Sequence, residues 1–533
     1  MLHTTMSRRG IVVAPHHLAA EAGVAVLREG GNAIEAMIAA AATIAVVYPH
    51  MNGLGGDNFW LISQGGKPPK AIDACGPAAA LASAEFYRAA GMETIPSRGP
   101  MAALTVAGAV GGWALALEEA RAIGGRMPLS RLLADPTTYA RDGISVSGTQ
   151  SNNTKTKIAE LAHQPGFAET YLHANEPPQI GSRLANAQLA ASLERLVTAG
   201  LDDFYRGDLA RAMAKDLVAA GSPIRLGDLE DFNALRVTPL SVRLRHGTAY
   251  NLPPPTQGLA SLMILGINDQ LPDVAPESFS YLHSLIESTK RAFMVRDRHV
   301  SDPAYMTIDP QAQLDPANLK KLAGTIDPSH ALAWPQPANA GDTVWLGAID
   351  ADGNAVSFIQ SVYWEFGSGV VLPSSGIIWQ NRGTSFSLDS THHNRLIPGR
   401  RPFHTIQPAM ALLDDGRVMP YGTMGGEGQP QTQSAIYTRY VVHGQDLQEA
   451  ITRPRWLLGR TWGADTTNLR IENRFEPEVI EAMRKAGHDV ELVGPFEEAM
   501  GHAGALVIHR SGPRAGLIEG ASDPRSDGRA AAF

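Results

Sequence analysis

The sequence predicts a mixed α/β (α+β) fold, in which layered β-sheets are covered by helices. Apolar residues recur with helical spacing in the segments where helices are expected: 17–27, 33–48, 101–120, 185–220, 279–300, 430–443 and 476–487. Short runs rich in β-formers, most of them after residue 343, mark the expected strands: 58–62, 70–75, 343–349, 355–363, 376–380, 407–413, 417–422 and 504–509. Strands from both parts of the chain, with helices outside them, predict a layered architecture.

Length and charge limit the classes of function. A chain of 533 residues exceeds one ordinary hydrophobic core, so length alone suggests two or more domains. Its 44% hydrophobic and 18% charged residues are typical of a globular protein. The formal net charge of −8 argues against nucleic acid or an anionic membrane as a partner.

Cysteine and histidine usage argues against a metal site. Cys75 is the only cysteine, so an intramolecular disulfide is impossible and a cysteine-based metal site is not expected. The adjacent His392 and His393 lack the spacing of a zinc-binding helix pair. Residues 1–10 lack the apolar core of a secretory signal, which predicts a cytoplasmic protein. The longest apolar run, 36–48, is too short for a bilayer of about 30 Å, so no membrane partner is expected.

Local signals define some boundaries. Asn32 and Glu35 have the spacing of a capping box, which begins the second expected helix. Residues 142–157 are expected to form a polar loop. The last part of the Pro-, Asp- and Ala-rich segment 301–342 is expected to be an exposed connector.

Two of the expected strands form a predicted hairpin in which Gly353 takes the left-handed position of a short turn. If Asp350 and Asn354 close this turn, Thr343 lies directly across the ladder from Ser361. Their Cβ atoms would then be about 4.5–5.5 Å apart. Two hydroxyls would therefore face each other where the first strand begins.

A threonine hydroxyl needs a base to become a nucleophile, and a threonine at a chain terminus can use its own α-amine. That amine has a pKa of about 7.7–8, so it is partly unprotonated at neutral pH. Thr343 is internal, so this chemistry requires cleavage of the Asp342–Thr343 bond. The alternative is an ordinary β-branched strand residue, which the hairpin alone favours.

Short motifs throughout the chain favour the nucleophile over the ordinary strand residue at Thr343. In chain order they are His17-Leu18-Ala19-Ala20, Gly30-Gly31-Asn32-Ala33, Pro49-His50, Gly53-Leu54-Gly55-Gly56, Leu252-Pro253-Pro254-Pro255, Lys290-Arg291-Ala292, Asp350-Ala351-Asp352-Gly353-Asn354-Ala355-Val356-Ser357, Phe366-Gly367-Ser368-Gly369, Gly425-Gly426 and Gly520-Ala521-Ser522-Asp523-Pro524-Arg525. Together and in this order, they resemble the γ-glutamyltranspeptidases, which are self-cleaving N-terminal nucleophile (Ntn) hydrolases. The similarity covers nearly the whole chain.

The resemblance implies a four-layer αββα sandwich made from two polypeptides. Residues 1–342 would form the large subunit and residues 343–533 the small subunit, and together they would make one domain. A dimer of such heterodimers is left open. The resemblance also implies that Thr343 is the nucleophile, that Ser361 is an assisting hydroxyl, and that Gly425 and Gly426 form the oxyanion hole. The alternative for the glycine pair is a tight turn that needs positive φ.

The expected substrate pocket departs from the resembled family. The family's carboxylate-binding arginine has no counterpart here, and Cys75 stands nearest to its position. Cys75 itself is predicted to be a small buried side chain. Ser385 falls on the family's amine-binding acidic residue, and Arg382 falls on a neighbouring glutamine. The pocket has thus lost an anion and gained a cation. This favours an acyl group with a carboxylate and no amine, held by Arg382 through two hydrogen bonds.

Three further positions differ from the family. His404 and Thr405 replace a serine pair, and Tyr363 replaces an asparagine and should share a strand face with Ser361. For His404, a structural histidine and a substrate donor are equally compatible with the sequence. For Arg382, a solvated loop arginine is the alternative.

These observations predict a self-processing amidohydrolase that acts on a small amide bearing a carboxylate. No metal or organic cofactor is expected, because nucleophile and base belong to one residue. One alternative is a glutathione hydrolase, a γ-glutamyltransferase or a glutaryl-type acylase. Another is an unprocessed binding protein on an inactivated scaffold, because Thr343-Val344-Trp345 replaces the family's usual Thr-Thr-His.

Overall fold

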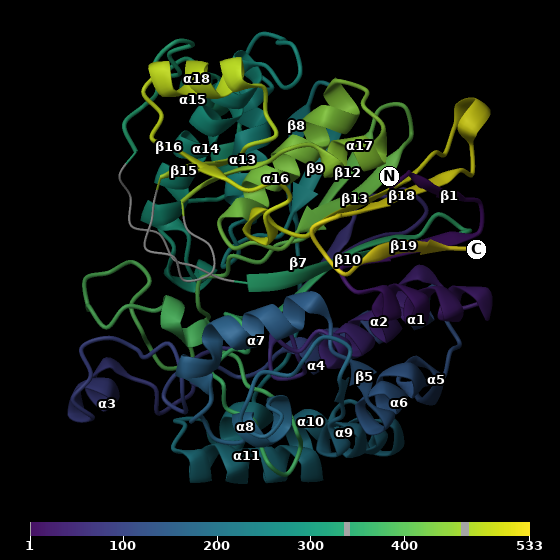
Figure 1. Ribbon diagram of the computed structural model, residues 1–533, viewed down its shortest axis with the longest axis vertical. Helices are drawn as coiled ribbons and strands as arrows, with labels where there is room; N and C mark the ends of the chain where they lie inside the picture. The colour runs from purple at the N-terminus through teal and green to yellow at the C-terminus, as the bar shows by residue number, and fades with distance from the viewer. Residues whose placement is uncertain (1, 335–341, 460–467) are drawn as a thin grey trace.

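The computed structural model describes residues 2–334, 342–459 and 468–533. Its centre consists of two seven-stranded sheets in which every neighbouring pair of strands is antiparallel. Helices lie outside them (Figure 1). Residues 335–341, where an exposed connector is expected, lie outside the described part.

The first sheet has the order β1 (Thr5–Ser7), β18 (Ile518–Ser522), β17 (Ala503–Ile508), β13 (Val418–Thr423), β12 (Ala409–Leu413), β9 (Gly247–Asn251) and β8 (Leu240–Leu244). The second has the order β19 (Arg529–Ala532), β2 (Gly10–Ala14), β10 (Asp342–Asp350), β11 (Ala355–Tyr363), β3 (Asp57–Ser63), β4 (Lys70–Ala74) and β7 (Leu235–Val237). Two small sheets contain β14 (Trp456–Leu458), β15 (Leu469–Glu472) and β16 (Val490–Val493), and β5 (Ile144–Ser145) and β6 (Arg183–Leu184).

The α-helices of the described residues are α1 (His17–Arg28), α2 (Ala33–Val47), α3 (Ala84–Ala89), α4 (Ala109–Ala122), α5 (Leu129–Leu132), α6 (Ala134–Asp142), α7 (Gly148–Leu161), α8 (Phe167–Tyr171), α9 (Ala187–Ala199), α10 (Asp203–Arg206), α11 (Asp208–Ala220), α12 (Leu226–Glu230), α13 (Gly258–Asn268), α14 (Phe279–His299), α15 (Pro316–Ala323), α16 (Gly428–Tyr437), α17 (Leu447–Thr452) and α18 (Pro477–Lys485).

The layers follow from the contacts between these elements. Helices α13 and α16 pack on the first sheet, and α2 and α4 pack on the second. Between them the two sheets face each other, with β10 and β11 of one against β13 of the other. Figure 1 shows the same order from α13 and α16 through the strands to α2 and α4. The predicted four-layer αββα sandwich is confirmed.

Both sheets combine strands from before and after residue 342. In the second sheet, β10 lies between β2 and β11, and β11 is followed by β3. In the first sheet, β12 pairs with β9 on one side and β13 on the other. The two parts of the chain therefore share ladders, and each of the three hydrophobic clusters contains residues from both parts.

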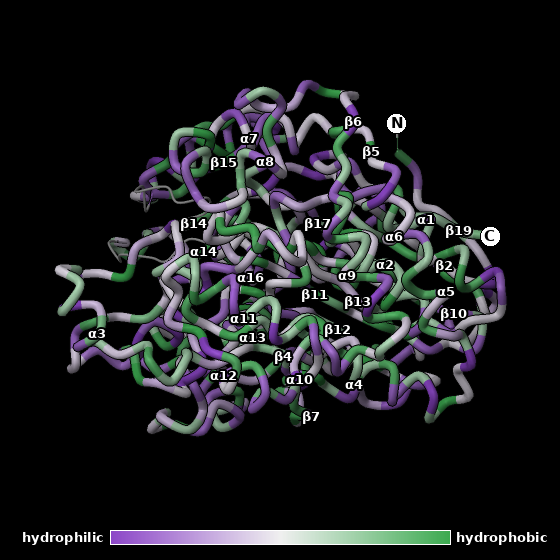
Figure 2. The backbone as a smooth tube through the Cα atoms, turned by 90° about the horizontal axis from the view of Figure 1, so that it is seen from below, coloured by the Kyte–Doolittle hydropathy of each residue, from purple (hydrophilic) through white to green (hydrophobic). Residues whose placement is uncertain are grey.

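The interior between the sheets is apolar and tightly packed. The indole of Trp345 is 1% exposed and occupies the space above two glycines. A Cβ at Gly422 would lie 2.2 Å from its Cδ1, and one at Gly504 would lie 2.4 Å from its Cζ3. The central strands are correspondingly hydrophobic, while the outer turns are more hydrophilic (Figure 2).

Helix α2 is buried along its whole length, as the alanine-rich sequence predicts. Its predicted capping box is confirmed: Asn32 Oδ1 accepts hydrogen bonds from the backbone N–H groups of Ile34 and Glu35, and Glu35 accepts one from Asn32 N. None of the helices described here combines the length and the apolar character needed to cross a membrane.

Two predictions of secondary structure are wrong in detail. The polar loop expected at 142–157 contains the start of α7, because Ser147 caps Gln150 N at 3.2 Å and begins a helix with a mostly solvated face. The strand expected at 376–380 forms isolated bridges only, in which Ile378 pairs with Val371.

The helix expected at 101–120 also begins later than predicted. Helix α4 starts at Ala109, after Gly108. The preceding residues form a turn at 101–102 and an isolated bridge between Thr105 and Ala78, because this segment packs against other backbone: a Cβ at Gly76 would lie 1.7 Å from Val106 O.

Gly422→Ala should lower the unfolding midpoint, because the added methyl group collides with Trp345 between the sheets. We expect the free energy of unfolding to fall by about 1–3 kcal/mol, as for other overpacked interiors. Gly227→Ala is the control, because nothing lies within 4 Å of its Cβ position and it lies in helix α12. Thermal unfolding followed by circular dichroism measures both. A Gly422→Ala protein that melts with the parent would contradict this packing.

Candidate functional site

The predicted hairpin is formed by β10 and β11. Asp350 N donates to Asn354 O at 3.2 Å, and Gly353 has φ +77°, as the turn requires. The ladder runs in the predicted register from Val344 opposite Gln360 to the turn. The turn and most of the register are confirmed.

The predicted direct pairing of Thr343 with Ser361 is wrong. The register shifts between Asp342 and Val344, and residue 342 stands opposite Tyr363. One extra residue on β11 thus makes a β-bulge where the predicted nucleophile lies. The Thr343 side chain is fully buried, and Gln429 Nε2 donates to its Oγ1 at 3.3 Å.

Ser361 lies beside this bulge and next to β3, where it pairs with Asp57. Its Oγ accepts a hydrogen bond from Tyr363 N at 2.8 Å. Tyr363 has φ +86°, which is rare for a residue with a side chain. The strand therefore turns at its end, and the Tyr363 ring comes to lie 3.6 Å from the guanidinium carbon of Arg382.

The glycine pair lies between β13 and α16. Gly425 and Gly426 have φ +114° and +52°, so both use conformations that favour glycine. Their carbonyls are engaged, by Gly428 N at 2.8 Å and by Gln257 Nε2 at 2.8 Å. Within the described residues, their N–H groups donate no hydrogen bond. Two backbone donors are thus available for an anion.

Arg382 is buried, with 1% of its surface exposed, so the alternative of a solvated loop arginine is wrong. Its contacts with Thr405 Oγ1 are long, at 3.4 and 3.5 Å. Within the described part of the chain it forms no ion pair with a carboxylate. Burial lowers its pKa to about 10, which still leaves it charged at neutral pH. Most of its five N–H donors thus remain available for an anionic group.

His404 and Asp57 form a buried pair beside this arginine. His404 Nε2 lies 3.4 Å from Asp57 Oδ2, but the geometry is not that of a hydrogen bond, and both ring nitrogens lack a partner in the described residues. Burial holds the pKa of His404 well below its usual value, so the ring is neutral. Burial also raises the pKa of Asp57 to about 7, although the N–H groups of Gly76 and Gly108 donate to its Oδ1.

Two further residues bear on the predicted substrate pocket, Ser385 and Cys75. Ser385 is buried, and its Oγ has no partner among the described residues. Cys75 is also buried, as expected, and burial raises the pKa of its thiol. Arg401 Nη1 lies 2.7 Å from Asp73 Oδ2, and its charge acts on both Cys75 and His404. Sequence analysis missed Arg401 and Asp57, because only the fold brings them to this position.

Two glutamines join these groups. Gln257 Nε2 donates to Thr405 O at 2.6 Å and to Gly426 O at 2.8 Å. Gln429 Oε1 accepts from Gln407 N at 3.2 Å, while its Nε2 donates to the predicted nucleophile. The loop that contacts Arg382 is therefore tied both to the glycine pair and to the start of β10.

A second cluster has the spacing of a metal site within the described residues. It consists of His283, Glu287 and His488. His283 Nδ1 and His488 Nε2 are hydrogen-bonded to each other at 2.9 Å, and Glu287 is ion-paired with Lys290 at 2.7 Å and with Arg291. Because each ligand atom already has a partner and the carboxylate is neutralised, this cluster is a hydrogen-bond network.

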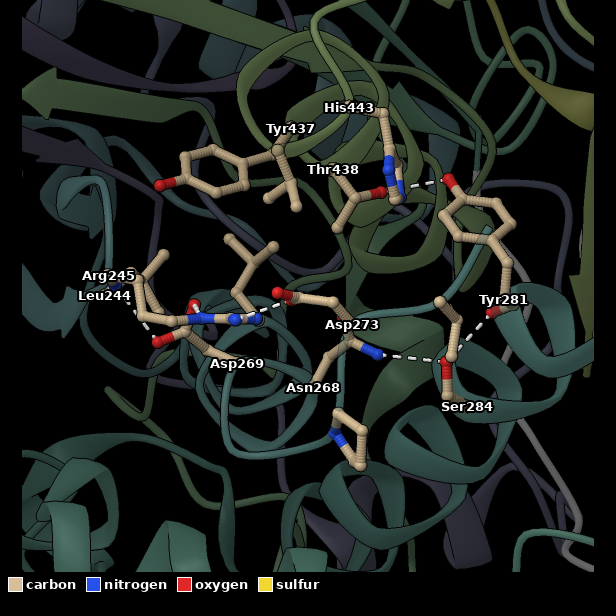
Figure 3. Close-up of a pocket in the computed structure, with 14 residues that line it drawn as sticks. Leu244, Arg245, Asn268, Asp269, Asp273, Tyr281, Ser284, Tyr437, Thr438 and His443 are labelled. Atoms are coloured by element: carbon tan, nitrogen blue, oxygen red, sulfur yellow. Dashed lines mark hydrogen bonds and ion pairs between the residues drawn. The ribbon is translucent and has the colours of Figure 1, made fainter. Parts of the chain in front are cut away.

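The small pocket in Figure 3 is also separate from the site, because no predicted site residue lines it. Its polar groups bind one another: Arg245 is paired with Asp273 at 2.6 Å, and Asn268 donates to Ser284 at 3.1 Å.

Comparison with known proteins agrees with this arrangement. The model of the gamma-glutamyltranspeptidase family matches residues 19–533. An oxamate amidohydrolase proenzyme of Klebsiella pneumoniae is 55% identical over 534 residues, covering 100% of both chains. A glutathione hydrolase-like proenzyme of Bacillus subtilis is 40% identical, covering 99% of both. The crystal structure of a cephalosporin acylase from Bacillus halodurans superposes with a TM-score of 0.91 at 31% identity, covering 100% of this chain and 97% of that one. The chain belongs to the gamma-glutamyltranspeptidase family.

Proposed function

We propose that the protein is a self-processing amidohydrolase that cleaves a small amide bearing a carboxylate, with oxamate as the expected substrate and oxalate and ammonia as products. The observation that carries this proposal is the buried guanidinium of Arg382, which forms no ion pair with a carboxylate in the described residues. The relative named oxamate amidohydrolase, at 55% identity, supports the same substrate.

The chain becomes active by cleavage between Asp342 and Thr343. Residues 1–342 then form the large subunit and residues 343–533 the small one. The new α-amine, with a pKa of about 7.7–8, accepts the proton of the Thr343 hydroxyl. Both sheets combine strands from the two parts, so the subunits stay together after the cut.

In turnover, Thr343 Oγ attacks the amide carbon of the substrate. The N–H groups of Gly425 and Gly426 hold the oxyanion, and Ser361 supports the nucleophile from the neighbouring strand. The α-ammonium returns its proton to the leaving nitrogen, which departs as ammonia. Water then attacks the threonyl ester and releases the acid.

The carboxylate of the substrate binds to Arg382 through two parallel hydrogen bonds. Neutral His404 supplies a further donor, and Thr405, Ser385 and Tyr363 line the same space. An ammonium group would be disfavoured here, because Arg382 is close by and the Asp57 carboxyl is partly protonated at neutral pH.

The purified processed protein should release ammonia from oxamate and act much more slowly on γ-glutamyl-p-nitroanilide and on glutaryl amides. An ammonia assay and absorbance of p-nitroaniline measure this panel. Turnover of γ-glutamyl-p-nitroanilide alone would overturn the proposed substrate and favour the glutathione hydrolase alternative. The acylase alternative has its own support in the acylase structure that superposes on the chain.

Thr343→Ala should abolish both self-cleavage and turnover, because it removes the attacking oxygen of both steps. Thr343→Ser is the matched control, which keeps a hydroxyl and the α-amine and should still be processed. Denaturing gels and the ammonia assay measure both variants. Cleavage at the same bond in Thr343→Ala would disprove this role.

Arg382→Ala should raise KM for carboxylate-bearing amides by about tenfold or more, because a charge-assisted pair is lost, while self-cleavage continues. Arg382→Lys keeps the charge but loses the planar fork, so it should fall between the parent and Arg382→Ala. Steady-state kinetics of the processed variants test this. Parent-like KM in Arg382→Ala would place the carboxylate elsewhere.

A further inference from the structure

Gln429 lies in the first turn of α16 and is fully buried. Its amide is held at both ends. The backbone N–H of Gln407 can only donate, so the atom that it meets at 3.2 Å is Oε1. The other amide atom is therefore the Nε2 donor, and it faces Thr343 Oγ1 at 3.3 Å.

This orientation has a chemical consequence for the threonine hydroxyl. A donor that occupies a lone pair of Oγ1 lies on a different side of the oxygen from its own proton. The proton of Oγ1 is thereby directed toward another acceptor. In the proposed mechanism, this acceptor is the α-amine of Thr343. The same donor stabilises negative charge on Oγ1 as the proton leaves. Hydrogen bonds that are long in the resting protein commonly shorten in the reacting complex.

The other end of Gln429 reaches the loop that contacts the proposed carboxylate anchor. Gln407 follows Thr405 by two residues, and Thr405 Oγ1 is the side-chain contact of Arg382. One amide thus spans the attacking oxygen and the backbone of the anchoring loop. This side chain therefore links the position of the nucleophile to that of the anchoring loop.

We propose that Gln429 is a further catalytic residue, which donates a hydrogen bond to Thr343 Oγ1 and sets this oxygen in place for both self-cleavage and turnover. This inference rests on the proposed role of Thr343. It assigns chemistry to a residue for which the sequence motifs gave no role.

The test uses two substitutions of similar size in the full-length protein. Gln429→Glu keeps the acceptor for Gln407 N and loses the Nε2 donor, and Gln429→Met loses both. The matched control is Gln433→Met. Gln433 lies one helical turn further along α16 and donates to Gln407 O at 3.0 Å, and Ser261 donates to its Oε1. It holds the same loop residue, and its side-chain hydrogen bonds within the described residues go to Gln407, Ser261 and Asn251.

Self-cleavage of the purified precursor is followed on denaturing gels, and turnover of the processed protein with oxamate. Both Gln429 variants should process more slowly and lose at least about tenfold in kcat, as for removal of one hydrogen bond to a developing charge. KM for oxamate and inhibition by oxalate should stay within about twofold of the parent in Gln429→Glu, because the anchor is retained. Gln433→Met should process and turn over like the parent.

Parent-like cleavage and kcat in Gln429→Met would overturn the inference. An equal loss in Gln433→Met would also overturn it, because the effect would then come from displacement of the loop. If a Gln429 variant never processes, normal cleavage of Gln433→Met supports the inference and failed cleavage contradicts it. The Thr343→Ala result tests the proposed function separately, because it does not depend on Gln429.

Discussion

The position of β10 is the constraint on which the rest of the structure depends. This strand lies inside the second sheet, hydrogen-bonded to β2 on one side and β11 on the other, and Thr343 lies at its beginning. β10 pairs with β11 along its length and with β2 from Gly347 to Asp350, so these ladders hold the strand whatever happens to the chain that precedes it. A cut between Asp342 and Thr343 would separate only the terminal Asp342–Tyr363 pair from the β10–β11 ladder, and the other strand pairs of both sheets would keep their partners. The fold can thus create a new chain terminus in its interior without losing its core.

The second physical feature is a group of buried polar side chains with unused hydrogen-bonding capacity. Burying a charge costs several kcal/mol unless a partner compensates it. The hydrogen bonds of Arg382 within the described residues are long, and the facing atoms of His404 and Asp57 are close but not hydrogen-bonded to each other. A bound carboxylate supplies the missing acceptors for the guanidinium and for a neutral imidazole. These buried groups therefore fit a binding site whose hydrogen bonds are completed by the substrate. They do not fit a structural core, in which buried polar groups satisfy one another.

Much of the fold was predictable because its signals are local. The turn around Gly353 determines the register from Val344 to the turn, and the spacing of Asn32 and Glu35 identifies the start of α2. The bulge at Thr343 was not predictable in the same way. It lies beside Tyr363, whose positive φ accompanies a hydrogen bond from its N–H to Ser361 Oγ and the packing of its ring on Arg382.

The site residues also divide into those with a local sequence signal and those that only the tertiary fold brings together. Thr343 begins the predicted hairpin that contains the Asp350–Ser357 motif, and the glycine pair is itself a short motif, so sequence alone identifies them as candidates. The burial of Arg382 is a property of the fold, and its spacing in the sequence left solvent exposure equally possible. Asp57 and Arg401 reach the site from segments far apart in the chain, and Gln429 acts through one amide orientation. None of these three has a sequence signal that separates it from an ordinary polar residue.

The central claim is that one peptide bond is severed to give a hydroxyl and an amine on the same residue. Intact-mass measurement with N-terminal sequencing of the mature protein tests it most directly. The account predicts two polypeptides, one ending at Asp342 and the other beginning Thr343-Val344-Trp345-Leu346. A single uncut chain, as expected for a binding protein on an inactivated scaffold, or a second chain with another first residue, would contradict it.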